Sequence, residues 1–358
     1  MAAALGVLAS CGSVKSGEDA IAASRDSKVV VAYVTSWSDV MPDPQCMTHI
    51  NYAFGHVNES FNGVKIDNEE RLKQIVDLKK QKPDLKVLLS IGGWGSGRFS
   101  EMAANDEYRR AFAVDCERVV EEFALDGIDI DWEYPTSSMA NISSSPDDTE
   151  NFTLLMQDIR AAIGNEKELT LATVASARYI DFKAILPSVD FVNIMAYDMA
   201  SAPKHHSALY PSGHSGDITS DGAVTAHLKA GVPPSKLVMG MPFYGRGGDG
   251  YPSFQDYNKV GNTDTQYTEK WDEVAQVPYL ADKNDTLVFG FENPRSLAIK
   301  CQYILDKDLL GGMYWDYSGD NEQGDLRRTV AENLLGKPHK AKVLVLTERG
   351  GQHGGFTD

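Results

Sequence analysis

Three carboxylates occupy alternate positions in one short segment of the chain. The segment Asp126–Pro135 reads DGIDIDWEYP and contains Asp129, Asp131 and Glu133. In a β-strand these three side chains would share one face, and apolar residues would occupy the other. Such carboxylates repel one another, and burying each costs several kcal/mol unless it is paired or protonated. A solvated edge strand would avoid that cost, but the apolar face favours a central strand. We therefore interpret the segment as an array of catalytic carboxylates that ends at Glu133.

The elements that would position this array alternate strands with helices from Lys28 onward. Eight mostly apolar runs are predicted to be strands, at 28–37, 49–57, 86–94, 126–135, 169–177, 190–199, 236–246 and 311–317. Helices are predicted from apolar residues at helical spacing around 68–82, 108–123, 152–159, 224–228, 294–304 and 325–335. Eight such units favour a parallel α/β sheet closed into a (β/α)8 barrel. A doubly wound open sheet would require a glycine-rich phosphate turn after the first strand, where the chain has Thr35-Ser36-Trp37.

Composition excludes some classes of partner. The formal charge is −17 and basic residues form no cluster, which argues against nucleic acid and anionic membrane as partners. Cys46, Cys116 and Cys301 are scattered, without a Cys-x-x-Cys spacing or a histidine partner. We therefore expect no metal site and no cofactor. A neutral substrate fits the charge balance better.

Polar and aromatic residues gather at the predicted carboxyl ends of several strands, where barrel enzymes place their chemistry. These residues are Ser90, Trp94, Glu133, Tyr134, Tyr197, Asp198, Tyr244, Arg246, Trp315 and Asp316. Tryptophan and tyrosine side chains around a carboxylate suggest sugar rings stacked on aromatic faces. The pattern predicts a cleft that processes glycosides.

Several ordered motifs resemble one family. Segment 126–133 matches the DxxDxDxE signature of family 18 glycoside hydrolases, the chitinase family. Segment 90–93 resembles the family's SxGG motif, and segment 195–198 resembles its MxYD motif. Tyr244-Gly245-Arg246 and Trp315 also lie at matching strand ends. The resemblance extends over about 28–335.

The resemblance implies a retaining mechanism in which the substrate supplies the nucleophile. Glu133 would protonate the glycosidic oxygen and later act as a base towards water. Asp131 would orient the acetamido N–H of the sugar in the −1 subsite, and Asp129 would share a proton with Asp131. Tyr197 would donate a hydrogen bond to the acetamido carbonyl. Trp315 would form the floor of the −1 subsite.

A wider set of sugar contacts is also implied by the resemblance. Trp94 is expected to stack at the +1 subsite. The other expected substrate-binding residues are Tyr33, Phe54, Ser90, Gly93, Met195, Asp198, Tyr244 and Arg246. Asp126 lies outside the two-residue phase of the array and is expected to be structural.

The expected substrate is chitin or a related β-1,4-linked N-acetylglucosamine oligomer. Some chitinases carry an α+β insertion between strands seven and eight; here only 247–310 separate them, and a predicted helix occupies part of that length. We therefore expect no large insertion domain and a shallow, open cleft.

Endo-β-N-acetylglucosaminidases that act on N-glycans are an alternative, although they would be expected to lack Trp315. A non-catalytic lectin is another, although such lectins usually lose the acid that Glu133 provides. Peptidoglycan cleavage is a third.

The two ends of the chain differ from the barrel. Residues 1–11 resemble a lipoprotein signal with Cys11 as the lipidated residue, although the positive segment that should precede the apolar run is missing. Residues 12–27 would form a flexible tether, 28–336 the catalytic barrel, and 337–358 a linker with the possible start of a further α/β domain that resembles ThuA-like domains. These features predict an exported monomer, either a bacterial cell-surface or periplasmic lipoprotein or a secreted protein. A membrane would be contacted only through a lipid on Cys11.

Overall fold

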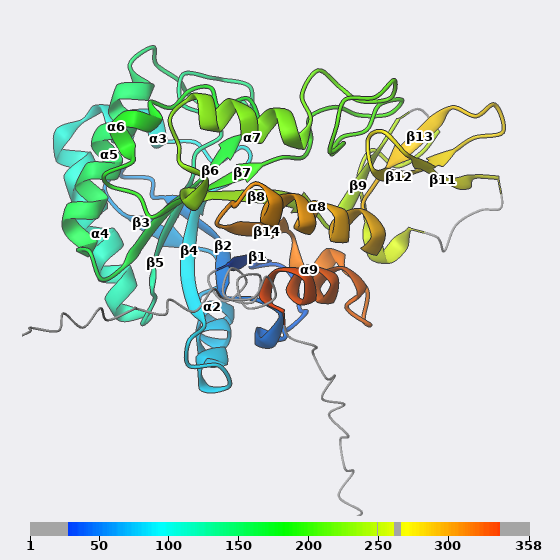
Figure 1. Ribbon diagram of the computed structural model, residues 1–358. Helices are drawn as coiled ribbons and strands as arrows, with labels where there is room; N and C mark the ends of the chain where they lie inside the picture. The colour runs from blue at the N-terminus through cyan, green and yellow to red at the C-terminus, as the bar shows by residue number, and fades with distance from the viewer. Residues whose placement is uncertain (1–27, 249, 261–265, 337–358) are drawn as a thin grey trace, which may run out of the picture.

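Eight parallel strands form a closed barrel in the computed structural model, which describes residues 28–248, 250–260 and 266–336 (Figure 1). The barrel strands are β1 (Val29–Thr35), β2 (His49–Val57), β4 (Lys86–Gly92), β5 (Gly127–Asp131), β6 (Glu168–Val174), β7 (Phe191–Met195), β8 (Leu237–Pro242) and β14 (Gly311–Trp315). They pair in the order β1-β14-β8-β7-β6-β5-β4-β2, and β2 pairs again with β1 to close the ring. The short strand β3 (Val64–Ile66) runs antiparallel to β2. The predicted (β/α)8 barrel is confirmed.

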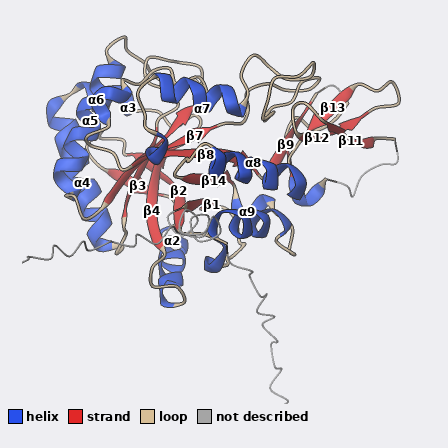
Figure 2. Cartoon of the chain, in the orientation of Figure 1, coloured by secondary structure: helices blue, strands red, loops and turns tan. Residues whose placement is uncertain are grey.

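Helices surround the barrel on its outer side (Figure 2). They are α2 (Glu69–Val76), α3 (Phe99–Ala104), α4 (Asp106–Glu122), α5 (Asp148–Ile163), α6 (Phe182–Ile185), α7 (Ser220–Lys229), α8 (Pro294–Asp306) and α9 (Asp325–Leu335). Short 3-10 turns are η1 (Pro44–Cys46), η2 (Asp77–Lys80), η3 (Pro234–Lys236), η4 (Tyr257–Lys259) and η5 (Tyr317–Gly319). Local capping fixes where several helices begin. Helix α8, for example, begins at a capping box in which Asn293 and Ser296 exchange hydrogen bonds.

Strand β1 is apolar on both faces because each face packs in a different core. In β1, Val30, Ala32 and Val34 belong to the large core between barrel and helices. The intervening Val31 and Tyr33 belong to the core inside the barrel. Both faces of this strand are therefore covered, as in other parallel sheets.

A second, smaller sheet extends from the barrel between β8 and α8, and Figure 1 shows it at the side of the molecule. Its strands are β9 (Tyr244–Gly247), β10 (Gln255–Asp256), β11 (Thr268–Asp272), β12 (Val277–Ala281) and β13 (Leu287–Gly290), paired antiparallel in the order β10-β9-β13-β12-β11. The sequence predicted a single strand over 236–246, whereas the structure divides this run at Phe243. Pro242 still pairs with Trp315 of β14, and the backbone N–H of Phe243 donates to the Trp315 carbonyl (2.7 Å), after which β9 pairs in the second sheet.

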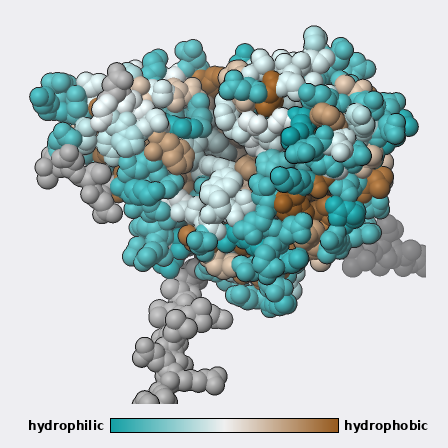
Figure 3. All heavy atoms as spheres, turned by 180° about the vertical axis from the view of Figure 1, so that it is seen from behind, coloured by the Kyte–Doolittle hydropathy of each residue, from teal (hydrophilic) through white to brown (hydrophobic). Residues whose placement is uncertain are grey.

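The predictions for the chain ends lie outside the described residues. They concern the lipidated Cys11, the tether 12–27 and the segment 337–358. None of the described helices is long and apolar enough to cross a membrane. Figure 3 shows the face of the molecule opposite to Figure 1, which is largely hydrophilic with apolar side chains in separate patches.

Candidate active site

A cleft of about 720 Å³ opens at the carboxyl ends of the barrel strands. Most of the site residues expected from the sequence line it: Tyr33, Phe54, Trp94, Asp131, Glu133, Met195, Tyr197, Asp198, Tyr244, Arg246 and Trp315. The other three, Ser90, Gly93 and Asp129, are not among its lining residues. The structure therefore gathers the predicted residues around one cavity. Their individual roles stay predictions.

Asp129 is fully buried and its carboxylate is saturated by hydrogen bonds. Oδ2 accepts from the hydroxyls of Tyr33 (2.9 Å) and Ser90 (2.8 Å). Oδ1 accepts from the hydroxyl of Thr170 (2.6 Å) and the amide of Asn193 (3.3 Å). Burial raises the pKa of Asp129, and these four donors oppose that rise. The arrangement fixes the first carboxylate of the array, while the proton that it would share with Asp131 stays a prediction.

Asp131 and Glu133 are the two carboxylates of the array that reach the cleft. Burial raises the pKa of Asp131, and the neighbouring carboxylates of Glu133 and Asp129 raise it further. Its Oδ1 is buried without a hydrogen-bond partner among the described residues. Burial also raises the pKa of Glu133 to about 7. The tip of the array thus holds a carboxyl group that can carry a proton near neutral pH, next to a carboxylate oxygen that lacks a donor.

Asp126 lies at the other end of β5, where its side chain contacts neighbouring elements of the barrel. Its Oδ2 accepts a hydrogen bond from the backbone N–H of Val87 (2.7 Å) and pairs with Lys79. These contacts tie β5 to β4 and to η2, in keeping with the structural role expected for Asp126.

Aromatic side chains form a wall of the cleft around Trp315. The ring of Phe54 stacks against Trp315 with centroids 5.6 Å apart, and Tyr33 contacts the same indole at 5.6 Å. Gly93 lies behind Phe54 with φ of +92°, and a Cβ at this position would lie 2.7 Å from the Phe54 ring. Glycine is therefore required there both by conformation and by space. Gly93 supports the wall from outside the cavity.

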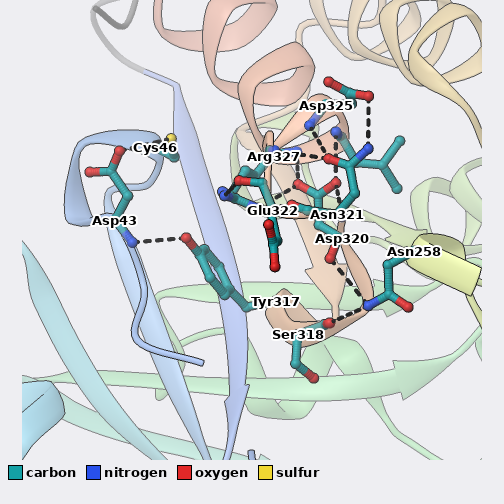
Figure 4. Close-up of polar contacts among 12 residues, drawn as sticks. Asp43, Cys46, Asn258, Tyr317, Ser318, Asp320, Asn321, Glu322, Asp325 and Arg327 are labelled. Carbon is teal, nitrogen blue, oxygen red and sulfur yellow. Dashed lines mark hydrogen bonds and ion pairs between the residues drawn. The ribbon is translucent and has the colours of Figure 1, made fainter. Parts of the chain in front are cut away.

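The loop after Trp315 is fastened by the polar contacts drawn in Figure 4. Asp320 pairs with Arg327 (3.0 Å) and also accepts from backbone N–H groups in the first turn of α9. The hydroxyl of Tyr317 accepts a hydrogen bond from the backbone N–H of Asp43 (2.8 Å). Asn258 of the second sheet region donates to the carbonyls of Ser318 and Asp320. Three separate segments thus meet at this loop, which fixes the strand end that carries Trp315.

Asp198 and Arg246 form a bidentate ion pair at the edge of the cleft. Arg246 Nε and Nη2 lie 2.7 and 2.6 Å from the two carboxylate oxygens of Asp198. Tyr197 precedes Asp198 and lines the cleft beside Tyr244, with ring centroids 6.1 Å apart. The second sheet contributes here, since Tyr244 and Arg246 lie on β9.

The family of the chain follows from comparison with known proteins. The model of "Glycosyl hydrolases family 18" matches residues 29–320. The chain belongs to this family. Chitinase A1 of Niallia circulans is 30% identical over 86% of this chain, which spans 58% of that protein's length. Chitotriosidase-1 of Mus musculus is 31% identical, with 82% of this chain and 74% of the mouse protein covered. A family 18 N-acetylglucosaminidase from Paenibacillus barengoltzii has a structure that matches with a TM-score of 0.79 and 33% identity, covering 86% of this chain and 99% of that one.

Some residues that line the cleft of this family 18 protein were missed by the sequence analysis as site residues. They are Trp37, Met139, Ala172, Val174, Ala175, Ser176, Arg178, Met199, Ile218 and Phe254. Trp37 is 64% exposed and Met139 is 66% exposed, so both offer apolar surface to a ligand. Trp37 ends the first predicted strand and Met139 follows the fourth, and neither position alone marks a contact with a ligand. Phe254 stacks on Tyr244 with ring centroids 4.7 Å apart and lies between β9 and β10 of the unpredicted second sheet, which explains why it was missed.

Proposed function

We propose that the protein hydrolyses β-1,4-linked N-acetylglucosamine polymers or oligomers, as a chitinase does, with retention and through an oxazolinium intermediate. The observation that carries the proposal is that the carboxyl groups of Glu133 and Asp131 lie near each other in a cleft lined by aromatic side chains. Glu133 has a pKa of about 7 and can donate a proton, and Asp131 presents a buried oxygen that lacks a donor. An acetamido N–H is a donor of the kind that this oxygen would accept.

The chemical steps assign one task to each group. Glu133 gives its proton to the glycosidic oxygen as the bond to the anomeric carbon breaks. The acetamido carbonyl oxygen of the −1 sugar attacks that carbon, and Asp131 holds the acetamido N–H and stabilises the positive charge that develops. Tyr197 donates to the acetamido group, and Trp315 supports the sugar ring. Glu133 then removes a proton from water, which opens the oxazolinium ion and restores the sugar.

The mechanism requires the substrate to carry its own nucleophile. Oligosaccharides of glucosamine without the N-acetyl group should therefore bind poorly and remain uncut. The open side of the cleft, with Trp94 61% exposed, is consistent with a sugar polymer that extends beyond the catalytic carboxyl. The names of the relatives, two chitinolytic enzymes and an N-acetylglucosaminidase, support the same substrate class.

Product analysis by mass spectrometry tests the proposal. Wild type and Glu133→Gln would be incubated with chitohexaose and, separately, with a high-mannose N-glycopeptide. Chito-oligosaccharide products from wild type alone are the expected result, and their lengths would separate internal cleavage from release of single sugars. Release of the glycan would instead identify an endo-β-N-acetylglucosaminidase. Binding without cleavage of either substrate would identify a lectin, and near-normal rates for Glu133→Gln would exclude Glu133 as the acid.

A further inference from the structure

His206 contacts Asp198 from the interior of the protein. Its side chain is fully buried, and it does not line the cleft. Nδ1 lies 3.4 Å from the backbone N of Asp198 and 3.5 Å from the carboxylate Oδ1 of the same residue. The imidazole also packs against Tyr244, with ring centroids 5.4 Å apart. One ring nitrogen therefore faces both the main chain and the side chain of a residue that lines the cleft.

The segment that carries His206 is anchored to the outer layer of the barrel. The hydroxyl of Ser207 donates to the Glu292 carboxylate (2.6 Å). Lys300 of α8 donates to the backbone carbonyl of Ser207 (2.5 Å) and pairs with Glu292. The Lys300 and Glu292 side chains are fully buried. The position of the imidazole is thus fixed from behind by a polar cluster whose residues are not among those described as lining the cleft.

Asp198 has a conformation that needs such support. Its φ is +54°, in the left-handed region that residues other than glycine seldom occupy. Arg246 holds the carboxylate from the exposed side. From the buried side, Nδ1 of His206 accepts from the backbone N–H of Asp198 when it is unprotonated and faces the carboxylate as a donor when it is protonated. Burial opposes ionisation of Asp198, but hydrogen bonds from Arg246 and His206 outweigh it and hold the pKa of this carboxyl below its usual range. Two supports therefore fix one carboxylate at the edge of the cleft.

We propose that His206 is a positioning residue, which fixes the main chain and the carboxylate of Asp198 for contact with the bound sugar. The inference rests on the proposed function, since it assumes that Asp198 touches an N-acetylglucosamine unit. A smaller side chain with a polar atom at the position of Nδ1 should preserve this role. Asparagine can place its amide close to the position of Nδ1, whereas leucine fills a similar volume without any polar atom.

Binding measured by calorimetry tests the inference. The chain with Glu133→Gln serves as the parent, so that chitotetraose binds without being cut. His206→Leu and His206→Asn are each added to it. His205→Leu is the matched control, because His205 is buried in the same segment but contacts Asp272 at 3.2 Å instead of Asp198. Loss of the contact between Nδ1 and Asp198 should raise the Kd about tenfold for His206→Leu, while the other two variants remain within about threefold of the parent.

The outcomes separate this inference from the proposed function. His206→Leu that binds like the parent would overturn the inference, as would His206→Asn or His205→Leu that binds as weakly as His206→Leu. If the parent itself fails to bind chitotetraose, the proposed function fails. Crystal structures of the two His206 variants then decide the positioning role without a ligand: Asp198 should move in His206→Leu and stay in place in His206→Asn, and an unmoved Asp198 in both would overturn it.

Discussion

At the scale of single residues, the proton on Glu133 controls the proposed reaction. Burial is the main cause that raises the pKa of this carboxyl to about 7, and the negative charge of Asp198 raises it further. A general acid works only while it is protonated. We therefore expect kcat/KM on chito-oligosaccharides to fall as the pH rises through about 7, and by about tenfold per pH unit well above it, because kcat/KM reports the pKa of the acid in the free enzyme. A pH–rate profile measures this directly.

Asp198→Asn provides a control for that profile. The substitution removes a negative charge that raises the pKa of Glu133, so the alkaline limb should move to lower pH whatever happens to the maximal rate. A wild-type limb near pH 4.3, the ordinary value for glutamic acid, would contradict the shift attributed to burial. An alkaline limb that stays in place in Asp198→Asn would contradict the claim that the charge of Asp198 raises the pKa of Glu133.

The sequence predicted best those residues that sit in motifs or at strand ends. Asp131 and Glu133 could be placed because their alternation and crowding carry a cost that packing alone does not explain. His206 and Phe254 could not be placed in this way, because their importance depends on contacts between segments far apart along the chain. A buried histidine has the same appearance in a sequence whether it supports a cleft or simply fills space. The saturation of Asp129 by four donors was equally invisible, since the donors come from four different strands.

At the scale of elements, helix α8 is joined to the segment that carries His206 through one buried ion pair and its hydrogen bond to Ser207. Lys300 pairs with Glu292, and both are inaccessible to solvent. Lys300→Met would leave the Glu292 carboxylate buried without its cation, which typically costs about 3–5 kcal/mol of unfolding free energy. Urea unfolding monitored by circular dichroism measures the loss. The double variant Lys300→Met with Glu292→Gln should recover a large part of it, because the buried charge is gone, and no recovery would contradict this account.

Element boundaries show where sequence patterns stop being informative. The last helix was predicted at 325–335 and is observed over the same residues, since it is delimited by Gly324 and Gly336, both with positive φ. The second sheet was missed because its strands are short and because β9 continues directly from the apolar run of β8. A single apolar run cannot reveal that its two halves pair in different sheets. The pairing is decided by β13, which lies more than forty residues further along the chain than β9.

At the scale of the whole molecule, the active site works against the stability of the barrel that holds it. The pKa of Asp131 is raised in the folded protein by burial first, and then by Glu133 and Asp129. When the pKa of a carboxyl group is higher in the folded than in the unfolded state, the free energy of unfolding is highest below the unfolded pKa. It falls as the pH rises through the folded pKa. At neutral pH the fold therefore bears the cost that this raised pKa represents, on a buried carboxyl group with one oxygen that lacks a hydrogen-bond partner among the described residues. This cost makes sense only if a ligand supplies the missing partner.

Asp131→Asn should accordingly stabilise the protein while it cripples turnover. The amide keeps the shape but removes the charge, so unfolding free energy at neutral pH should rise by about 0.5–2 kcal/mol, the usual gain from one stabilising substitution. The gain should shrink towards acidic pH and vanish below about pH 4, where Asp131 is protonated in both folded and unfolded states. Thermal unfolding of both proteins from pH 3 to pH 8 measures it. A gain that does not depend on pH would show that packing, and not the buried charge, separates the two proteins, and a loss at neutral pH would show that the fold uses this carboxylate for its own stability.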